Sequence, residues 1–239
     1  MFVLAASKRL ATLKAMALLA GLAGLAVIAG LQFSKGAVAP PEMRELTLPD
    51  GHRIAAARYE VTWSDWTRCV EAAACQTLPR PRLLQADQSI PVTGVNRLDA
   101  GDYLNWINRS TGQRYRLPGA AEWRAMAAER PRKTQKKLFD DPRLAWAADY
   151  GTMEQISAIV RPSGYFGTFG NGLSDLGGNV WEWTSTCAAP GFTEATCPAF
   201  IAAGLHEAAL SVFIRDPAVG GCAVGAPPAN VGFRLVLDR

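Results

Sequence analysis

The amino-acid sequence predicts a single α+β domain that follows one N-terminal transmembrane helix. Three observations lead to this prediction. The chain has 239 residues, of which 49% are hydrophobic and 19% charged, so it can bury one sizeable core. Two or three segments with helical spacing of apolar residues lie among many short strand patterns and long loops. Near the N-terminus, residues 15–34 carry no charge.

The uncharged stretch 15–34 predicts how the N-terminus is placed. It is close to the roughly 20 residues that span a bilayer, and longer than the roughly 7 to 15 residues of a signal-peptide core. Basic residues within positions 1–14 precede it, so we expect a cytoplasmic basic tail there and a single-pass signal anchor at 15–34 in the inner membrane. Residues 35–43 are small and proline-bearing, which predicts a linker to a periplasmic domain at 44–239.

Signal cleavage is the competing outcome for this N-terminus. The small residues Ala37, Val38 and Ala39 are typical of a processing site, and cutting there would release the domain into the periplasm. Pro40 directly follows them and would obstruct a signal peptidase. We therefore expect the anchor to be retained.

The charge pattern does not indicate nucleic-acid binding. The formal net charge is +4, and the one dense basic run, residues 130–137, has no interleaved aromatic residues. We expect a solvated basic loop there and no nucleic-acid partner.

The five cysteines agree with export to an oxidising compartment, because no two of them have the close spacing of a zinc or redox motif. Cys69 and Cys75 flank a short helical segment and are expected to form a local disulfide. Of the remaining three, we expect Cys187 to pair with Cys197. A Cys197–Cys222 bridge is a serious rival, and sequence spacing does not choose between them.

The first elements are expected in the order strand, strand, helix. The turn at residues 49–51 lies between two short strand patterns. Ser64 is a candidate N-cap for a helix whose apolar positions Trp66, Cys69 and Val70 recur at helical spacing. Polar and proline-broken residues 77–90 predict a loop.

Two further helices are expected before the second half of the chain. The first begins at Asp99 or a neighbour and stops near Gly112. The second begins at residues 118–119 and contains Trp123 and Met126.

The second half has weaker periodicity. Its first part is expected to place aromatic core plugs under long loops; these are Trp146, Tyr150, Tyr165, Phe166 and Phe169. Residues 204–214 suit either a strand or a short helix. The end of the chain predicts one last strand with alternate residues on one face, namely Val231, Phe233, Leu235 and Leu237.

The most informative stretch is residues 171–185, NGLSDLGGNVWEWTS. Its glycines predict a shaped loop, and its two tryptophans alternate as in a short strand that enters a core. Asp175, Asn179 and Glu182 supply hard oxygen ligands, so we expect a calcium-stabilised loop. The alternative is that these carboxylates accept backbone N–H bonds within turns.

Five segments together resemble the formylglycine-generating enzyme (sulfatase-modifying factor) family over residues 44–239. In chain order they are YEVTWSDW, PVTGVNRLDAGDYLNWIN, GQRYRLPGAAEWRAMA, GLSDLGGNVWEWTS and NVGFRLV. The resemblance implies a compact fold of low regular secondary-structure content, distantly related to C-type lectins.

The resemblance also implies two calcium sites. One would use the side chains of Asp175 and Glu182 with the carbonyls of Gly178 and Val180. A second, weaker match uses Asp149 with the Tyr150 carbonyl.

Catalytic activity is not expected from the same comparison. Family members that make formylglycine resemble one another through a Gly-Gly-Ser-aromatic block and two nearby cysteines that hold copper, and residues 204–214 contain neither. A lone Cys222 makes a poor copper site, so no redox metal is expected. The iron-dependent members use several histidines, whereas His52 and His206 are expected as surface or satisfied polar side chains. No GxSxG elbow indicates a serine hydrolase.

We therefore expect a non-catalytic, membrane-anchored binding or scaffold module of an envelope assembly. The resemblance extends to exported family domains that accompany type VI secretion and its kinase pathway, which suggests an accessory role with a periplasmic or membrane protein partner. The alternative is a metal-dependent oxidase of the formylglycine-generating type with a diverged active site.

Overall fold

A computed structural model describes residues 38–79, 88–128, 159–204, 207–216 and 230–239. From Pro40 onwards, the described residues belong to one compact unit. Within these ranges no helix is both long and apolar enough to cross a bilayer. The anchor predicted at 15–34 lies outside the described residues.

The first sheet is antiparallel, with strand order β1-β2-β7. It contains β1 (Met43–Thr47), β2 (Arg53–Ala57) and β7 (Val236–Asp238). The predicted turn between β1 and β2 is present, and Gly51 adopts a positive φ of 86° there, a conformation that costs glycine least. The sheet therefore pairs the first strands of the domain with its C-terminal end.

The second sheet has strand order β5-β4-β3-β6. Its members are β3 (Trp181–Cys187), β4 (Ala199–Ala203), β5 (Glu207–Ser211) and β6 (Val231–Gly232). Strands β3 and β6 run parallel, whereas β3–β4 and β4–β5 are antiparallel. The ambiguous segment 204–214 thus contributes a strand.

The prediction of one last strand at the C-terminus is wrong. Strand β6 belongs to the second sheet and β7 to the first, so the chain crosses between the sheets through residues 233–235. Phe233, Arg234 and Leu235 are all at most 1% exposed. Because the segment is buried on every side, simple alternation does not describe which residues face the core.

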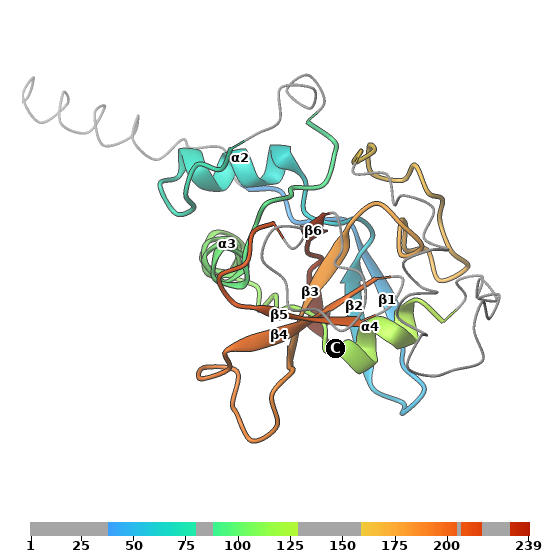
Figure 1. The fold of residues 1–239 in the computed structure, drawn as a ribbon. Coiled ribbons are helices and arrows are strands. Elements are labelled where there is room, and N and C mark those ends of the chain that lie inside the picture. The colour runs from blue at the N-terminus through green and yellow to red at the C-terminus, as the bar shows by residue number, and fades with distance from the viewer. Residues whose placement is uncertain (1–37, 80–87, 129–158, 205–206, 217–229) are drawn as a thin grey trace, which may run out of the picture. The chain divides into compact units, whose positions relative to one another are not determined.

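Three helices complete the described fold (Figure 1). Helix α2 (Trp63–Glu71) packs against α3 (Arg97–Thr111), and α4 (Ala120–Met126) packs against β3 and β4. The N-cap of α2 is Thr62, not Ser64, because the Thr62 hydroxyl and the Asp65 carboxylate form a reciprocal capping box. Helix α3 ends, as predicted, at Gly112 with φ of 69°.

The core cluster joins the first sheet, α4, β4 and residues 171–180, which we call the glycine-rich loop. Its buried members are Leu48, Ile54, Ala56, Trp123, Met126, Ala127, Leu173, Leu176, Ala203 and Val236. This arrangement brings the stretch 171–185 into the centre of the domain rather than to its edge.

Two disulfides are formed as predicted. Cys69 pairs with Cys75 at the end of α2, with 5.3 Å between their Cα atoms. Cys187 pairs with Cys197, which closes the end of β3 onto the segment before β4, with 5.8 Å between their Cα atoms. Loops of these lengths correspond to about 2–3 kcal/mol each in the chain-entropy account. Cys222 lies outside the described residues.

Candidate functional site

The stretch 171–185 forms a loop that leads into β3, and two of its residues have unusual backbone conformations. Asp175 and Asn179 have φ of 65° and 70°, in the left-handed region that non-glycine residues seldom adopt. Both side chains reach across to the segment just before the loop. Such conformations persist only where surrounding contacts hold them, which makes these contacts informative.

Asp175 and Asn179 hold a segment that we call the aromatic loop, residues 161–169. The backbone N–H groups of Gly164 and Phe166 donate to the Asp175 carboxylate, the latter at 2.8 Å. Asn179 accepts from the Arg161 N–H at 2.9 Å and donates to the Arg161 carbonyl at 3.1 Å. The glycine-rich loop therefore serves as the base on which the aromatic loop is fixed.

The aromatic loop presents two large rings to solvent. Tyr165 is 62% and Phe166 46% exposed, and their rings meet edge to face at 5.2 Å. The Arg161 guanidinium lies 5.2 Å from the Tyr165 ring centre. The expectation that these two residues are core plugs is wrong, whereas Phe169 does pack against the core cluster. Trp146 and Tyr150 lie outside the described residues.

Position 178 requires a glycine because the Phe166 ring lies against it. A Cβ atom at position 178 would come within 2.9 Å of the Phe166 ring, closer than side-chain packing permits. The glycine therefore supports the exposed ring by close backbone approach. This contact, like those of Asp175 and Asn179, couples residues 171–180 to the aromatic loop.

Glu182 forms a fully buried ion pair with Arg234. The distance from Arg234 Nη2 to Glu182 Oε1 is 2.8 Å and that from Nε to Oε2 is 3.0 Å. The Trp123 indole N–H also donates to Oε2 at 2.9 Å. Trp181 and Trp183 alternate with Glu182 along β3 and so lie on the other face of the strand, which is therefore buried on both faces.

The remaining N–H groups of Arg234 bind backbone carbonyls. They donate to the carbonyls of Ala57, Arg58 and Ser174 at 2.7–2.9 Å. All the N–H groups of the guanidinium are thus bonded, and their acceptors belong to three separate segments of the chain. A buried charge is tolerated only under such conditions.

The predicted calcium ligands are already bonded to protein donors. Glu182 is paired with Arg234 and Trp123, and Asp175 accepts two backbone N–H groups. A calcium ion at Glu182 would lie beside a fixed positive charge, so this donor set as it stands does not fit the ion. Calcium at Asp175, Gly178, Val180 and Glu182 stays a prediction that requires Arg234 to give up part of its pairing. Asp149 and Tyr150 lie outside the described residues.

A second buried carboxylate, Glu60, lies near the same guanidinium. One of its oxygens is 3.8 Å from Arg234 Nη2, and neither oxygen has a hydrogen-bond partner among the residues that the structure describes. Burial raises the pKa of Glu60 to about 8, although Arg234 opposes the rise. Burial also raises the pKa of Asp175, against the two N–H groups that it accepts. Glu60 therefore keeps its proton to a higher pH than an exposed glutamate does.

Comparison with known proteins places the chain in a family. The model of the "Sulfatase-modifying factor enzyme 1-like domain" matches residues 21–239. The chain belongs to this family. The resemblance seen in the sequence motifs is thereby confirmed.

Solved structures agree with the family at the level of fold. PvdO from Pseudomonas aeruginosa is 19% identical with a TM-score of 0.54, covering 84% of this chain and 92% of that one. Treponema denticola variable protein 1 is 14% identical with a TM-score of 0.55, covering 82% and 95%. CarF is 17% identical with a TM-score of 0.51, covering 84% and 100%. None of the curated proteins compared with the chain matches it.

Sequence reasoning did not assign roles to Glu60 or Arg234. A signal was present for Arg234, which is a charged residue within the otherwise apolar run VGFRLVL; such residues are seldom fully buried unless paired. Glu60 gave no such signal, since Arg58 and Thr62 lie close to it in the sequence. Their partners lie 52 or more positions away, as for Glu182 and Arg234. Pattern alone does not reveal which opposite charge meets which.

We predict that Glu60→Gln removes a pH dependence of stability. Between the unfolded value of 4.5 and about 8, the folded protein holds a proton on Glu60 that the unfolded chain releases. The contribution of this group to stability is therefore present at low pH and is lost as pH rises through this window. Urea unfolding from pH 5 to 8.5 should show a smaller decline in the variant. Equal declines in both proteins would contradict the prediction.

We also predict that Glu182→Gln destabilises the domain by roughly 3–5 kcal/mol, because it leaves Arg234 without its buried counter-charge. Urea unfolding of both proteins measures this loss.

Thermal melting of both proteins, with and without a calcium chelator, tests the calcium prediction as well. If calcium binds at Glu182, the chelator lowers the melting temperature of the wild type alone, and an unchanged wild-type melt removes calcium from this place.

Proposed function

We propose that this chain is a non-catalytic binding module that is anchored in the inner membrane and contributes to an envelope assembly. The observation that carries the proposal is the state of the cysteines. Four of the five, Cys69, Cys75, Cys187 and Cys197, are joined in disulfides. Only Cys222 is left, so the chain lacks a second free thiol for the copper-holding pair that the family resemblance associates with formylglycine formation.

The aromatic loop is the contact surface that we assign to this module. Aromatic side chains and arginine are enriched at the centres of protein interfaces, because they offer large contact area with few rotatable bonds. Tyr165, Phe166 and Arg161 lie together and are fixed from below by Asp175 and Asn179. A surface that is already ordered loses less conformational entropy when a partner binds.

We propose a protein of the periplasm or membrane as the partner. An accessory role in a secretion system or its kinase pathway is the finer form of this proposal. The disulfides support the compartment, since such bonds form and persist outside the reducing cytoplasm.

A photo-crosslinking amino acid placed at Tyr165 should capture a discrete protein partner in intact cells. The matched control is the same residue at Phe213, which is 70% exposed and lies beyond β5. Capture at 165 but not at 213 is the expected result. Identical products from both positions would contradict the aromatic loop as the contact surface.

Stoichiometric copper or iron in the purified chain, with oxygen-dependent turnover of a cysteine-containing peptide, would instead favour the alternative function, a metal-dependent oxidase.

The topology gives a separate expectation. Alkaline phosphatase fused after Arg239 should be active, because that enzyme needs an oxidising compartment to form its own disulfides. Enzyme activity in colonies measures this directly. An inactive fusion, with the fusion protein present in full length, would overturn export of the domain.

A further inference from the structure

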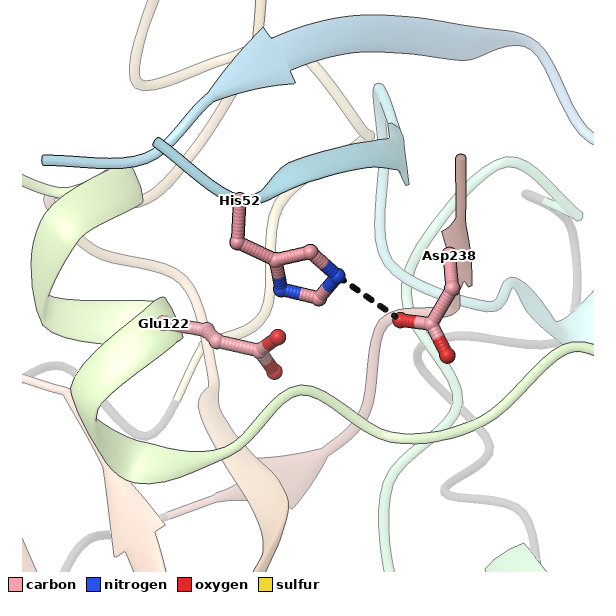
Figure 2. Close-up of side chains that lie close together, drawn as sticks. All are labelled: His52, Glu122 and Asp238. Atoms are coloured by element: carbon pink, nitrogen blue, oxygen red, sulfur yellow. Dashed lines mark ion pairs between the residues drawn. The ribbon is translucent and has the colours of Figure 1, made fainter. Parts of the chain in front are cut away.

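A histidine and two carboxylates meet on the surface of the domain, at residues that the binding proposal does not use. His52 lies in the turn before β2, Glu122 in the first turn of α4, and Asp238 at the end of β7 (Figure 2). One ligand atom from each lies within 4.8 Å of the others. The sheet register explains part of this, since Asp238 is opposite Ile54, two residues after His52.

The imidazole of His52 faces the carboxylates without bonding them. Its Nε2 atom is 3.9 Å from Asp238 Oδ1, which is too long for a hydrogen bond. Figure 2 shows the ring between the carboxylates of Glu122 and Asp238, with one nitrogen toward each. The His52 side chain is 46% exposed.

Arg116 orients the two carboxylates and keeps them charged. It donates to both oxygens of Glu122 at 2.7 Å and, through Nε, to Asp238 Oδ1 at 3.1 Å. Burial raises the pKa of Glu122, but the bonds from Arg116 and the Gly119 N–H outweigh it and the net pKa is lowered. Hydrogen bonding to Arg116 lowers the pKa of Asp238. Metal ligands must be deprotonated, and both of these are.

Arg116 does not use up the ligand capacity of the cluster. Each carboxylate oxygen has two lone pairs, and among the described residues Asp238 Oδ2 accepts no hydrogen bond. Two carboxylates and one guanidinium carry a net charge of about −1, which still attracts a dication. Arg116 and Asp238 are also partly exposed, so their side chains can adjust when an ion enters.

We propose that His52, Glu122 and Asp238 bind a divalent first-row transition metal, with Zn²⁺ as the representative ion. One imidazole nitrogen and two carboxylate oxygens form a donor set that suits zinc better than calcium or magnesium, which prefer oxygen alone. Three protein ligands leave a fourth position open to water or to a ligand from a partner. Bonds of about 2.0–2.2 Å place tetrahedral ligands nearer together than they are here, so the side chains close around the ion.

Such an ion would connect three parts of the domain that are far apart in the sequence. It would join the β1–β2 turn, α4 and the C-terminal strand, and so stabilise the folded state by mass action. The site is separate from the ion pair of Glu182 and from the aromatic loop.

The test is zinc titration of the full-length chain in chelator-free buffer at pH 7.5, followed by calorimetry and by thermal melting. One Zn²⁺ per chain and a higher melting temperature are expected. His52→Ala and Asp238→Asn should each weaken binding by more than about tenfold. Both residues are surface-exposed, so the variants should fold.

Two matched controls distinguish this site from incidental binding. His206→Ala removes the only other histidine, and Cys222→Ser removes the one cysteine outside the two disulfides. Both controls should bind zinc as the wild type does. Unchanged affinity in His52→Ala and Asp238→Asn, loss of binding in either control, or no zinc binding by the wild type would overturn the proposal.

Discussion

The rest of the domain depends on the ion pair and the hydrogen bonds of the buried Arg234 guanidinium. Removing a charge from water is costly, and this cost is offset only when every N–H group has a well-placed acceptor. Here the acceptors come from the end of β2, the glycine-rich loop and β3. These segments must therefore assemble together. The pair of Arg234 with Glu182 thus specifies where both sheets and the loop meet.

The same centre explains how the surface is organised. Ser174, whose carbonyl accepts from Arg234, directly precedes Asp175, whose carboxylate holds the backbone of the aromatic loop. The left-handed conformations of Asp175 and Asn179 occur where their side chains bond the aromatic loop. A rigid base beneath Tyr165 and Phe166 is consistent with a surface shaped for contact rather than with a loosely packed loop.

The cysteines and the titratable side chains of the chain differ in burial and in bonding. The disulfides engage four of the five cysteines and fasten α2 and β3 to their following segments. Burial raises the pKa of Glu60, which lies close to the same guanidinium and has no hydrogen-bond partner for its side chain among the described residues. His52, Glu122 and Asp238 take no part in this buried network, and Arg116 holds the two carboxylates beside the imidazole. The buried charges therefore maintain the fold, and the cluster at His52 is the one that we propose for metal binding.

Local sequence determined the elements and the family, because the signals concerned act over a few residues. The turn at Gly51, the end of α3 at Gly112 and the Cys69–Cys75 disulfide were predictable from spacing and local conformational preference, whereas spacing left a rival to the Cys187–Cys197 bridge. The motif NGLSDLGGNVWEWTS was rightly seen as a shaped loop leading into a strand. Only the tertiary structure decided that Glu182 meets Arg234, that β6 and β7 join different sheets, and that Tyr165 faces solvent. The physical reason is that burial, and the pairing of buried charges, are set by segments far apart in the chain, which no local pattern records.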